Sequence, residues 1–163
     1  MKHPIGTIVS QMVDYERGVP HRVHHFLKVY AFAKVIGEAE GLSEREQEIL
    51  QIAAIMHDIG IRPSIAKYGS GEGGFQEMEG PCVAREVLAR LDYDPELIER
   101  VCYLIAHHHS YGAQREKDLQ ILVEADFLVN ALEESLSREA VERMSQDVFR
   151  TERGKAYLQA MFL

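Results

Sequence analysis

An apolar helical run that ends in an adjacent histidine and aspartate constrains this chain more than any other feature. The run reads Ala53-Ala54-Ile55-Met56-His57-Asp58-Ile59-Gly60. A buried imidazole and a buried carboxylate both need partners, because an unpaired buried charge is costly, and one divalent cation would satisfy both. Consecutive helical residues point apart, so His57 and Asp58 can share an ion only where the helix ends. Gly60 and Pro63 predict such an end.

Apolar residues recur with the 3.6-residue period of helices along most of the chain. Ser43 with Glu46 predicts a capping box, and Asp94 with Pro95 predicts a second well-marked helix start. No segment shows a credible strand pattern, so we expect an all-α fold of about six to seven helices. The predicted helices cover residues 4–16, 21–40, 43 to about 60, 76–91, 94–109, 116–134 and 137–162.

A chain of 163 residues is long enough to bury one core, and we expect a single domain over residues 1–163. Its central part should span about residues 20–135. Residues 136–163 should form a peripheral helical segment that Gly154 interrupts. The glycine-rich stretch 60–75 is predicted to be the loop of the protein, either a surface connection or a lid over the site.

Composition narrows the range of partners. The net charge of −8 argues against a general nucleic-acid or membrane-surface binder, and it leaves small anions open. The apolar runs are too short to span a bilayer, and residues 1–10 lack the apolar core of a signal peptide, so we expect a cytoplasmic protein. Apolar residues near the C-terminus leave a homo-oligomer possible: Tyr157, Leu158, Met161 and Phe162.

Two further polar residues fall on predicted inner helix faces, far from the first pair in sequence. His25 begins the buried stripe of its helix, and Asp126 lies within the strongly apolar segment 121–129. Each alone has an ordinary explanation as a satisfied core residue. Together with His57 and Asp58 they form a mixed nitrogen and oxygen set that suits manganese, iron, nickel, cobalt or zinc. The absence of paired thiolates argues against a structural zinc site.

The order histidine, histidine-aspartate, aspartate resembles the HD-domain superfamily of metal-dependent phosphohydrolases. Three segments carry the resemblance, within about residues 20–135: His25-Phe26-Leu27-Lys28-Val29, the run 53–60, and Ile121-Leu122-Val123-Glu124-Ala125-Asp126-Phe127-Leu128. The resemblance implies an all-α bundle, a metal held by His25, His57, Asp58 and Asp126, and hydrolysis of phosphate esters or anhydrides.

The chain departs from the family pattern in two places. Binuclear members have a histidine four residues before a glycine in the fourth helix, whereas Gln76 stands there, before Gly80. One metal is therefore favoured and two stay possible, with Glu77 or Glu79 as substitute ligands. Several members also have a lysine directly after His-Asp-Ile-Gly, where this chain has Ile61.

The resemblance also implies roles around the metal. Asp58 would assist the attacking water, while His108 or His109 would neutralise charge on the phosphoryl oxygens or protonate the leaving group. Lys28, Arg62 and Lys67 are the candidate substrate-binding cations. We expect hydrolysis of a small phosphorylated substrate, with a nucleotide favoured. Two alternatives stay open: a metal-containing module that binds nucleotides without turnover, and a di-iron oxygenase, which needs two metals.

Overall fold

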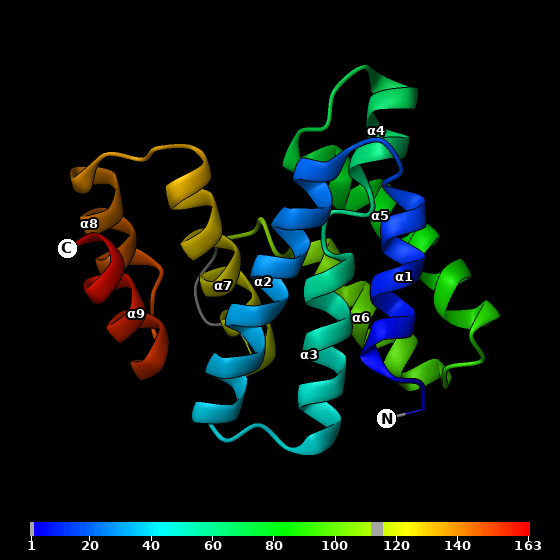
Figure 1. Ribbon diagram of the computed structural model, residues 1–163, viewed down its shortest axis with the longest axis horizontal. Coiled ribbons are helices and arrows are strands. Elements are labelled where there is room, and N and C mark those ends of the chain that lie inside the picture. The colour runs from blue at the N-terminus through cyan, green and yellow to red at the C-terminus, as the bar shows by residue number, and fades with distance from the viewer. Residues whose placement is uncertain (1, 112–115) are drawn as a thin grey trace.

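Helices form all the regular structure in the part of the chain that the computed structural model describes, residues 2–111 and 116–163 (Figure 1). The all-α prediction is confirmed, with nine helices in these ranges instead of six to seven. They are α1 (Ile5–Tyr15), α2 (Pro20–Ala39), α3 (Glu44–Met56), α4 (Ile61–Tyr68), α5 (Gly73–Arg90), α6 (Pro95–His107), α7 (Lys117–Glu133), α8 (Arg138–Asp147) and α9 (Glu152–Phe162).

The centre of the bundle is α3, which packs against α1, α2, α6 and α7 (Figure 1). Every residue from Glu48 to Met56 on this helix is buried. A helix that is apolar on nearly all sides is stable only when other helices surround it. Most of α7 is buried in the same way, with every residue from Asp118 to Val129 buried. The C-terminal end of α3 and the middle of α7 therefore meet inside the protein, which brings His57 and Asp126 together.

The predicted helix starts of α3 and α6 are confirmed. Ser43 accepts a hydrogen bond from the backbone N–H of Glu46, whose side chain in turn accepts one from the backbone N–H of Ser43. Asp94 accepts from the backbone N–H of Leu97 at 3.0 Å, and Pro95 takes the first helical position. These caps satisfy donors that the first helical turn would otherwise leave without partners.

The prediction of a loop over residues 60–75 is wrong, because α4 occupies Ile61–Tyr68. Pro63 lies in the first turn, where a missing N–H costs nothing. Gly69, with φ of +71°, ends the helix in the left-handed conformation that glycine adopts readily. The connection to α5 is therefore short. Tyr68 stacks on Phe75 across it, with ring centroids 4.4 Å apart.

The C-terminal segment forms two helices, and the break falls at residues 148–151, not at Gly154. Thr151 caps α9 by accepting from the backbone N–H of Gly154. Gly154 lies inside α9, where α9 approaches α7 closely. A Cβ at this position would lie 2.1 Å from Glu124 Oε1 on α7, which explains why the residue is a glycine. The buried Glu124 carboxylate also accepts from the Thr151 hydroxyl at 2.8 Å, which fixes α9 against α7.

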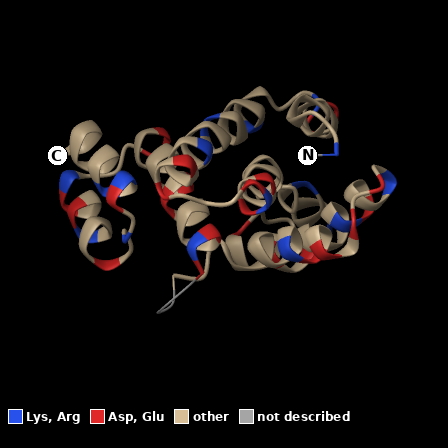
Figure 2. Ribbon diagram, turned by 90° about the horizontal axis from the view of Figure 1, so that it is seen from below, with Lys and Arg blue, Asp and Glu red and all other residues tan. Residues whose placement is uncertain are grey.

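Basic and acidic residues are interspersed along the helices of the described part of the chain (Figure 2). Among residues 2–111 and 116–163, no helix combines the length and the apolar character needed to cross a membrane.

Candidate metal centre

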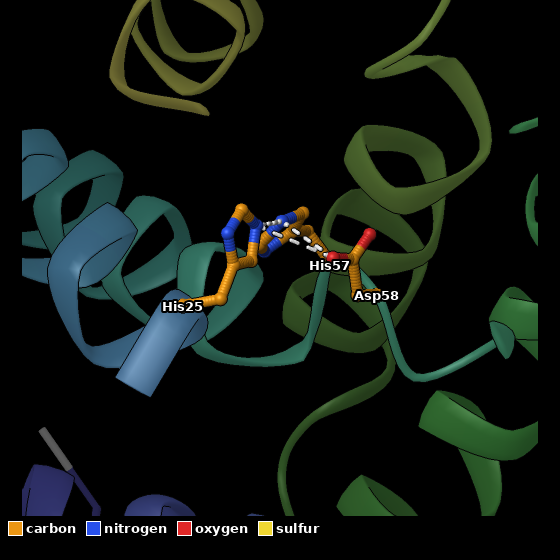
Figure 3. A group of neighbouring side chains, drawn as sticks. All are labelled: His25, His57 and Asp58. Carbon is orange, nitrogen blue, oxygen red and sulfur yellow. Dashed lines mark hydrogen bonds and ion pairs between the residues drawn. The ribbon is translucent and has the colours of Figure 1, made fainter. Parts of the chain in front are cut away.

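The turn between α3 and α4 brings His57 and Asp58 to one point. Because α3 ends at Met56 and α4 begins at Ile61, the two side chains lie on a turn and not on a regular helix (Figure 3). Tyr15 holds this turn from α1 by donating its hydroxyl hydrogen bond to the carbonyl of Ile59 at 2.8 Å. Burial of this phenol raises the pKa of Tyr15 to about 12.

Gly60 lets this turn approach α5 closely. A Cβ at Gly60 would lie 2.4 Å from the backbone oxygen of Gln76 and 2.8 Å from the backbone nitrogen of Gly80. Both contacts are with backbone atoms, which cannot swing aside as a side chain can. Close packing of the turn against α5 therefore explains why position 60 is a glycine.

Four ligand-type atoms from three parts of the chain converge beside this turn. Nε2 of His25, on α2, lies 3.2 Å from Nε2 of His57 and 3.3 Å from Oδ2 of Asp58. Oδ1 of Asp126, on α7, lies 3.2 Å from His25 Nε2 and 3.3 Å from His57 Nε2. Neighbouring atoms bonded at about 2.0–2.3 Å to one ion lie roughly 3 Å apart, so these spacings fit a shared metal.

In His25 and His57, the ring nitrogen Nδ1 makes a hydrogen bond, and this leaves Nε2 free to bind a metal ion. Nδ1 of His57 donates to the carbonyl of Ala54 at 2.7 Å, and Nδ1 of His25 donates to Glu133 Oε2 at 3.0 Å. Since Nδ1 carries the hydrogen in both rings, the Nε2 lone pairs face the cluster. Protein metal sites commonly fix their histidine ligands through such contacts.

A third imidazole faces the cluster from the end of α6. His108 is completely buried, and its Nδ1 donates to the carbonyl of Ile105 at 2.8 Å. Its Nε2 lies 3.7 Å from Asp58 Oδ1. Among the described residues, His108 Nε2 and Asp126 Oδ1 make no hydrogen bond, although both atoms are buried. Buried polar atoms are rarely left so, and a metal ion or its bound water would partner both.

Electrostatics in the cluster also favour a bound cation. Burial alone would lower the pKa of His57, but Asp58 and Asp126 raise it well above its usual value. Burial likewise opposes the charged form of Asp126, yet His57 and His25 hold its pKa well below the usual range. Two buried carboxylates thus draw positive charge into the cluster, either as protons or as a metal ion.

His109 and Gln76 form a neighbouring polar pair. Burial, helped by the nearby His108, lowers the pKa of His109 to about 4, so this ring is neutral near pH 7. Its Nε2 lies 3.3 Å from Gln76 Oε1, while Gln76 Nε2 donates to the carbonyl of Gly71 at 2.8 Å. His109 can also join Asp58 and His108 in a second group with metal-ligand spacing. Gln76 is therefore committed to two partners at the position where the resemblance leads us to expect a histidine in a two-metal site.

The two glutamates named as substitute ligands differ in their contacts. Glu79 Oε1 lies 2.9 Å from the ammonium of Lys67 and accepts a hydrogen bond from the hydroxyl of Tyr68 at 2.8 Å. Its carboxylate is therefore engaged in exposed contacts and not with the metal cluster. Glu77 lies near the α6 end, where the hydroxyl of Ser110 is 3.5 Å from its Oε2.

A small cleft opens onto the cluster, with a volume of about 270 Å³. Its lining includes the ligand-type residues His25, Asp58 and Asp126, together with Gln76 and His109. A larger cavity of about 640 Å³ lies elsewhere, lined by α3, α6 and α7 residues such as Arg45, Arg100 and Lys117. The larger cavity contains none of the clustered residues, so we assign the chemistry to the smaller one.

The three predicted substrate-binding cations do not line this cleft. Lys28 lies 2.6 Å from Glu133 Oε1, Arg62 lies 3.6 Å from Glu16 Oε2, and Lys67 pairs with Glu79. Each is therefore paired with a glutamate: Lys28 with Glu133, which lines the cleft, and the other two with glutamates outside its lining.

Four polar residues that sequence reasoning missed line the cleft instead: Arg22, Asn130, Glu133 and Glu134. Asn130 and Glu133 lie four and seven residues after Asp126, on the same helix face, so the helical period could have found them. Arg22 lies three residues before His25, which is a comparable signal.

Comparison with protein families agrees with this geometry. A family model described as "HD domain" matches residues 22–131, more than half of the chain. The chain therefore belongs to the HD-domain family, and the matched range contains all four clustered residues. Comparisons with curated proteins and with solved structures gave no match.

Proposed function

We propose that the protein is a phosphohydrolase that uses a divalent transition metal to cleave a phosphate ester or anhydride of a small metabolite, with nucleotides as the favoured class. The observation that carries the proposal is the convergence of His25, His57, Asp58 and Asp126 at spacings of 3.2–3.3 Å. Membership of the HD-domain family, in which metal-dependent hydrolases predominate, supports the same reading.

These four residues would hold the ion. When bound, it would polarise a phosphoryl oxygen and lower the pKa of a bound water toward neutrality. The two imidazoles and two carboxylates suit manganese, iron, cobalt, nickel or zinc. One ion is favoured, since Gln76 already binds the carbonyl of Gly71 and His109.

The remaining groups of the cleft would handle protons and charge. Asp58 Oδ1 faces His108 Nε2 at 3.7 Å, so this pair would take up the proton that the attacking water loses. His109 is neutral near pH 7, so we assign it an N–H hydrogen bond to a phosphoryl oxygen and no proton transfer to the leaving group. The volume of about 270 Å³ favours a small substrate over a polymer.

A binding module without turnover is the second candidate. One observation favours it: Lys28, Arg62 and Lys67 are each paired with a glutamate and do not line the cleft. Such a protein would keep the metal and bind a nucleotide without cleaving it. The oxygenase alternative needs two metals, and the engagement of Gln76 argues against that.

Turnover separates these candidates. The manganese-loaded protein would be assayed on p-nitrophenyl phosphate, bis(p-nitrophenyl) phosphate and a set of nucleotides, beside His108→Ala and His107→Ala. His107 belongs to the same triplet, but its ring stacks on Tyr103 at 4.2 Å and serves as the control. We expect hydrolysis that falls at least about 100-fold in His108→Ala and stays near wild type in His107→Ala. Nucleotide binding without hydrolysis would reject the enzyme and favour the binding module.

A further inference from the structure

Arg22 is the cation that faces the cleft. It lies in the first turn of α2, three residues before His25, and its side chain is 18 % exposed. Among the described residues that line the cleft, it is the only lysine or arginine. The acidic residues of the same lining are Asp58, Asp126, Glu133 and Glu134. A phosphorylated substrate that enters would therefore meet four carboxylates and one guanidinium among the lining residues.

Glu16 holds this guanidinium in place. It lies directly after α1, its side chain is 2 % exposed, and its Oε2 accepts a hydrogen bond from Arg22 Nη1 at 3.0 Å. Arg62 approaches the same oxygen at 3.6 Å from α4. A carboxylate this deeply buried is stable only with charged partners, so the position of Arg22 is fixed by the fold.

The pairing leaves much of the guanidinium unused. Arginine carries five N–H donors in a planar fork, and Glu16 engages one terminal nitrogen of Arg22. Across residues 2–111 and 116–163, the guanidinium of Arg22 has no other hydrogen-bond partner. A planar donor pair with a fixed orientation is the group that binds two oxygens of a phosphate at once.

We propose that Glu16 and Arg22 form the phosphate-binding unit of this cleft, in which Arg22 binds the non-bridging phosphate oxygens and Glu16 positions Arg22. The inference rests on the proposed function, because it assumes that the ligand beside the metal cluster carries a phosphate. Glu16 lies outside the matched family range of residues 22–131, so this half of the unit comes from the residue that directly follows α1.

A purely structural role is the competing explanation. In that case Arg22 would only neutralise Glu16, and its loss would lower the stability of the protein without a specific effect on phosphate. The two explanations differ in what happens to phosphate affinity at unchanged metal content.

The test is calorimetric titration of inorganic phosphate into the manganese-loaded protein. The variants are Arg22→Ala, Arg22→Lys and Glu16→Gln. The control is Arg17→Ala, which removes the same charge from a side chain that is 83 % exposed and pairs with Asp14. Manganese affinity and the unfolding midpoint are measured on every variant.

We expect Arg22→Ala to weaken phosphate binding by about 10- to 100-fold, the usual range for a lost charge-assisted contact, with manganese affinity unchanged. Arg22→Lys should recover part of the loss, because it keeps the charge but not the fork. Glu16→Gln should weaken binding less than Arg22→Ala. If Arg22→Ala does not fold, the lysine and glutamine variants carry the same comparison.

Three results would overturn the proposal: wild type that does not bind phosphate, Arg22 variants that bind it like wild type, or an equal loss in Arg17→Ala. Failure of the proposed hydrolase is a separate outcome. Phosphate binding that depends on Arg22 without any turnover would keep this inference and reject the enzyme. Turnover whose KM does not respond to Arg22→Ala would do the reverse.

Discussion

Glu133 accepts a hydrogen bond from Nδ1 of His25 at 3.0 Å, and its other oxygen lies 2.6 Å from the ammonium of Lys28. It lies seven residues after Asp126 on α7, so one helix supplies both a candidate ligand and the carboxylate that orients another. Helix α7 thus orients the ring of His25 through Glu133 and also contributes Asp126 to the cluster.

Replacing Glu133 with glutamine should weaken metal binding. The variant keeps the shape of the side chain but loses the negative charge that makes His25 a better ligand, and such changes cost about 10- to 100-fold in metal affinity. Competition titration with a chelator measures the effect. Glu134→Gln is the matched control, since Glu134 lines the same cleft and makes no hydrogen bond or ion pair with His25 among the described residues. Equal losses in both variants would mean that only the overall charge of the cleft matters.

Removing the hydroxyl of Tyr15 should loosen the turn that holds His57 and Asp58. Tyr15→Phe leaves the carbonyl of Ile59 without its donor, and a lost hydrogen bond of this kind costs about 1 kcal/mol in the free energy of unfolding. Urea unfolding measures that loss. Tyr30→Phe is the control, because the hydroxyl of Tyr30 makes no hydrogen bond within the described part of the chain. A Tyr15→Phe variant as stable as wild type would show that packing alone sets the turn.

Sequence reasoning predicted the cluster because three of its segments follow simple rules. The helical period places His25 and Asp126 on buried faces, and Gly60 marks the turn that follows α3 and contains His57. The prediction of a loop over residues 60–75 was wrong because α4 depends on contacts that local composition does not reveal, such as the stacking of Tyr68 on Phe75.

The placement of the cations was harder to predict. Long charged side chains reach whichever carboxylate lies nearest in space, and α1 brings Glu16 to Arg22 and Arg62. Nothing in the local sequence indicates that pairing. Lys67 was chosen for its position after the His57-Asp58 pair, yet its partner Glu79 lies on the next helix.

Introducing a histidine at position 76 should raise the metal content. Gln76→His would add an imidazole beside His109, where Asp58, His108 and His109 already have metal-ligand spacing. We expect elemental analysis to rise from about one to about two metals per chain. Gln51→His is the control, since Gln51 is also buried but lies within α3, away from this group. Unchanged metal content would mean that the second position needs more than one added ligand.

The stability of the metal-free protein should fall as pH rises above about 6.5. Asp58 and Asp126 overcome burial and raise the pKa of His57, so the folded state keeps a proton that the unfolded chain loses. Stability from a raised pKa is present below the unfolded value and is lost as pH rises through the folded value. The lowered pKa of His109, about 4, makes stability rise with pH only below this range.

Thermal unfolding between about pH 6.5 and 8.5 measures this effect with and without manganese. A metal ion replaces the protons, so the stabilisation by manganese should grow with pH. In metal-free His57→Gln the downward slope should be smaller. A metal-free wild type whose stability increases over this range would contradict the assignment of the proton to the cluster.

The central claim is that His25, His57, Asp58 and Asp126 hold a metal ion, and elemental analysis tests it most directly. Wild type, Asp126→Asn and the surface control Asp147→Asn would be purified in parallel and reconstituted with manganese, then freed of unbound metal. We predict about one metal per chain in wild type and in the control, and a small fraction of that in Asp126→Asn. Wild type without metal after reconstitution, or Asp126→Asn with a full complement, would contradict the account.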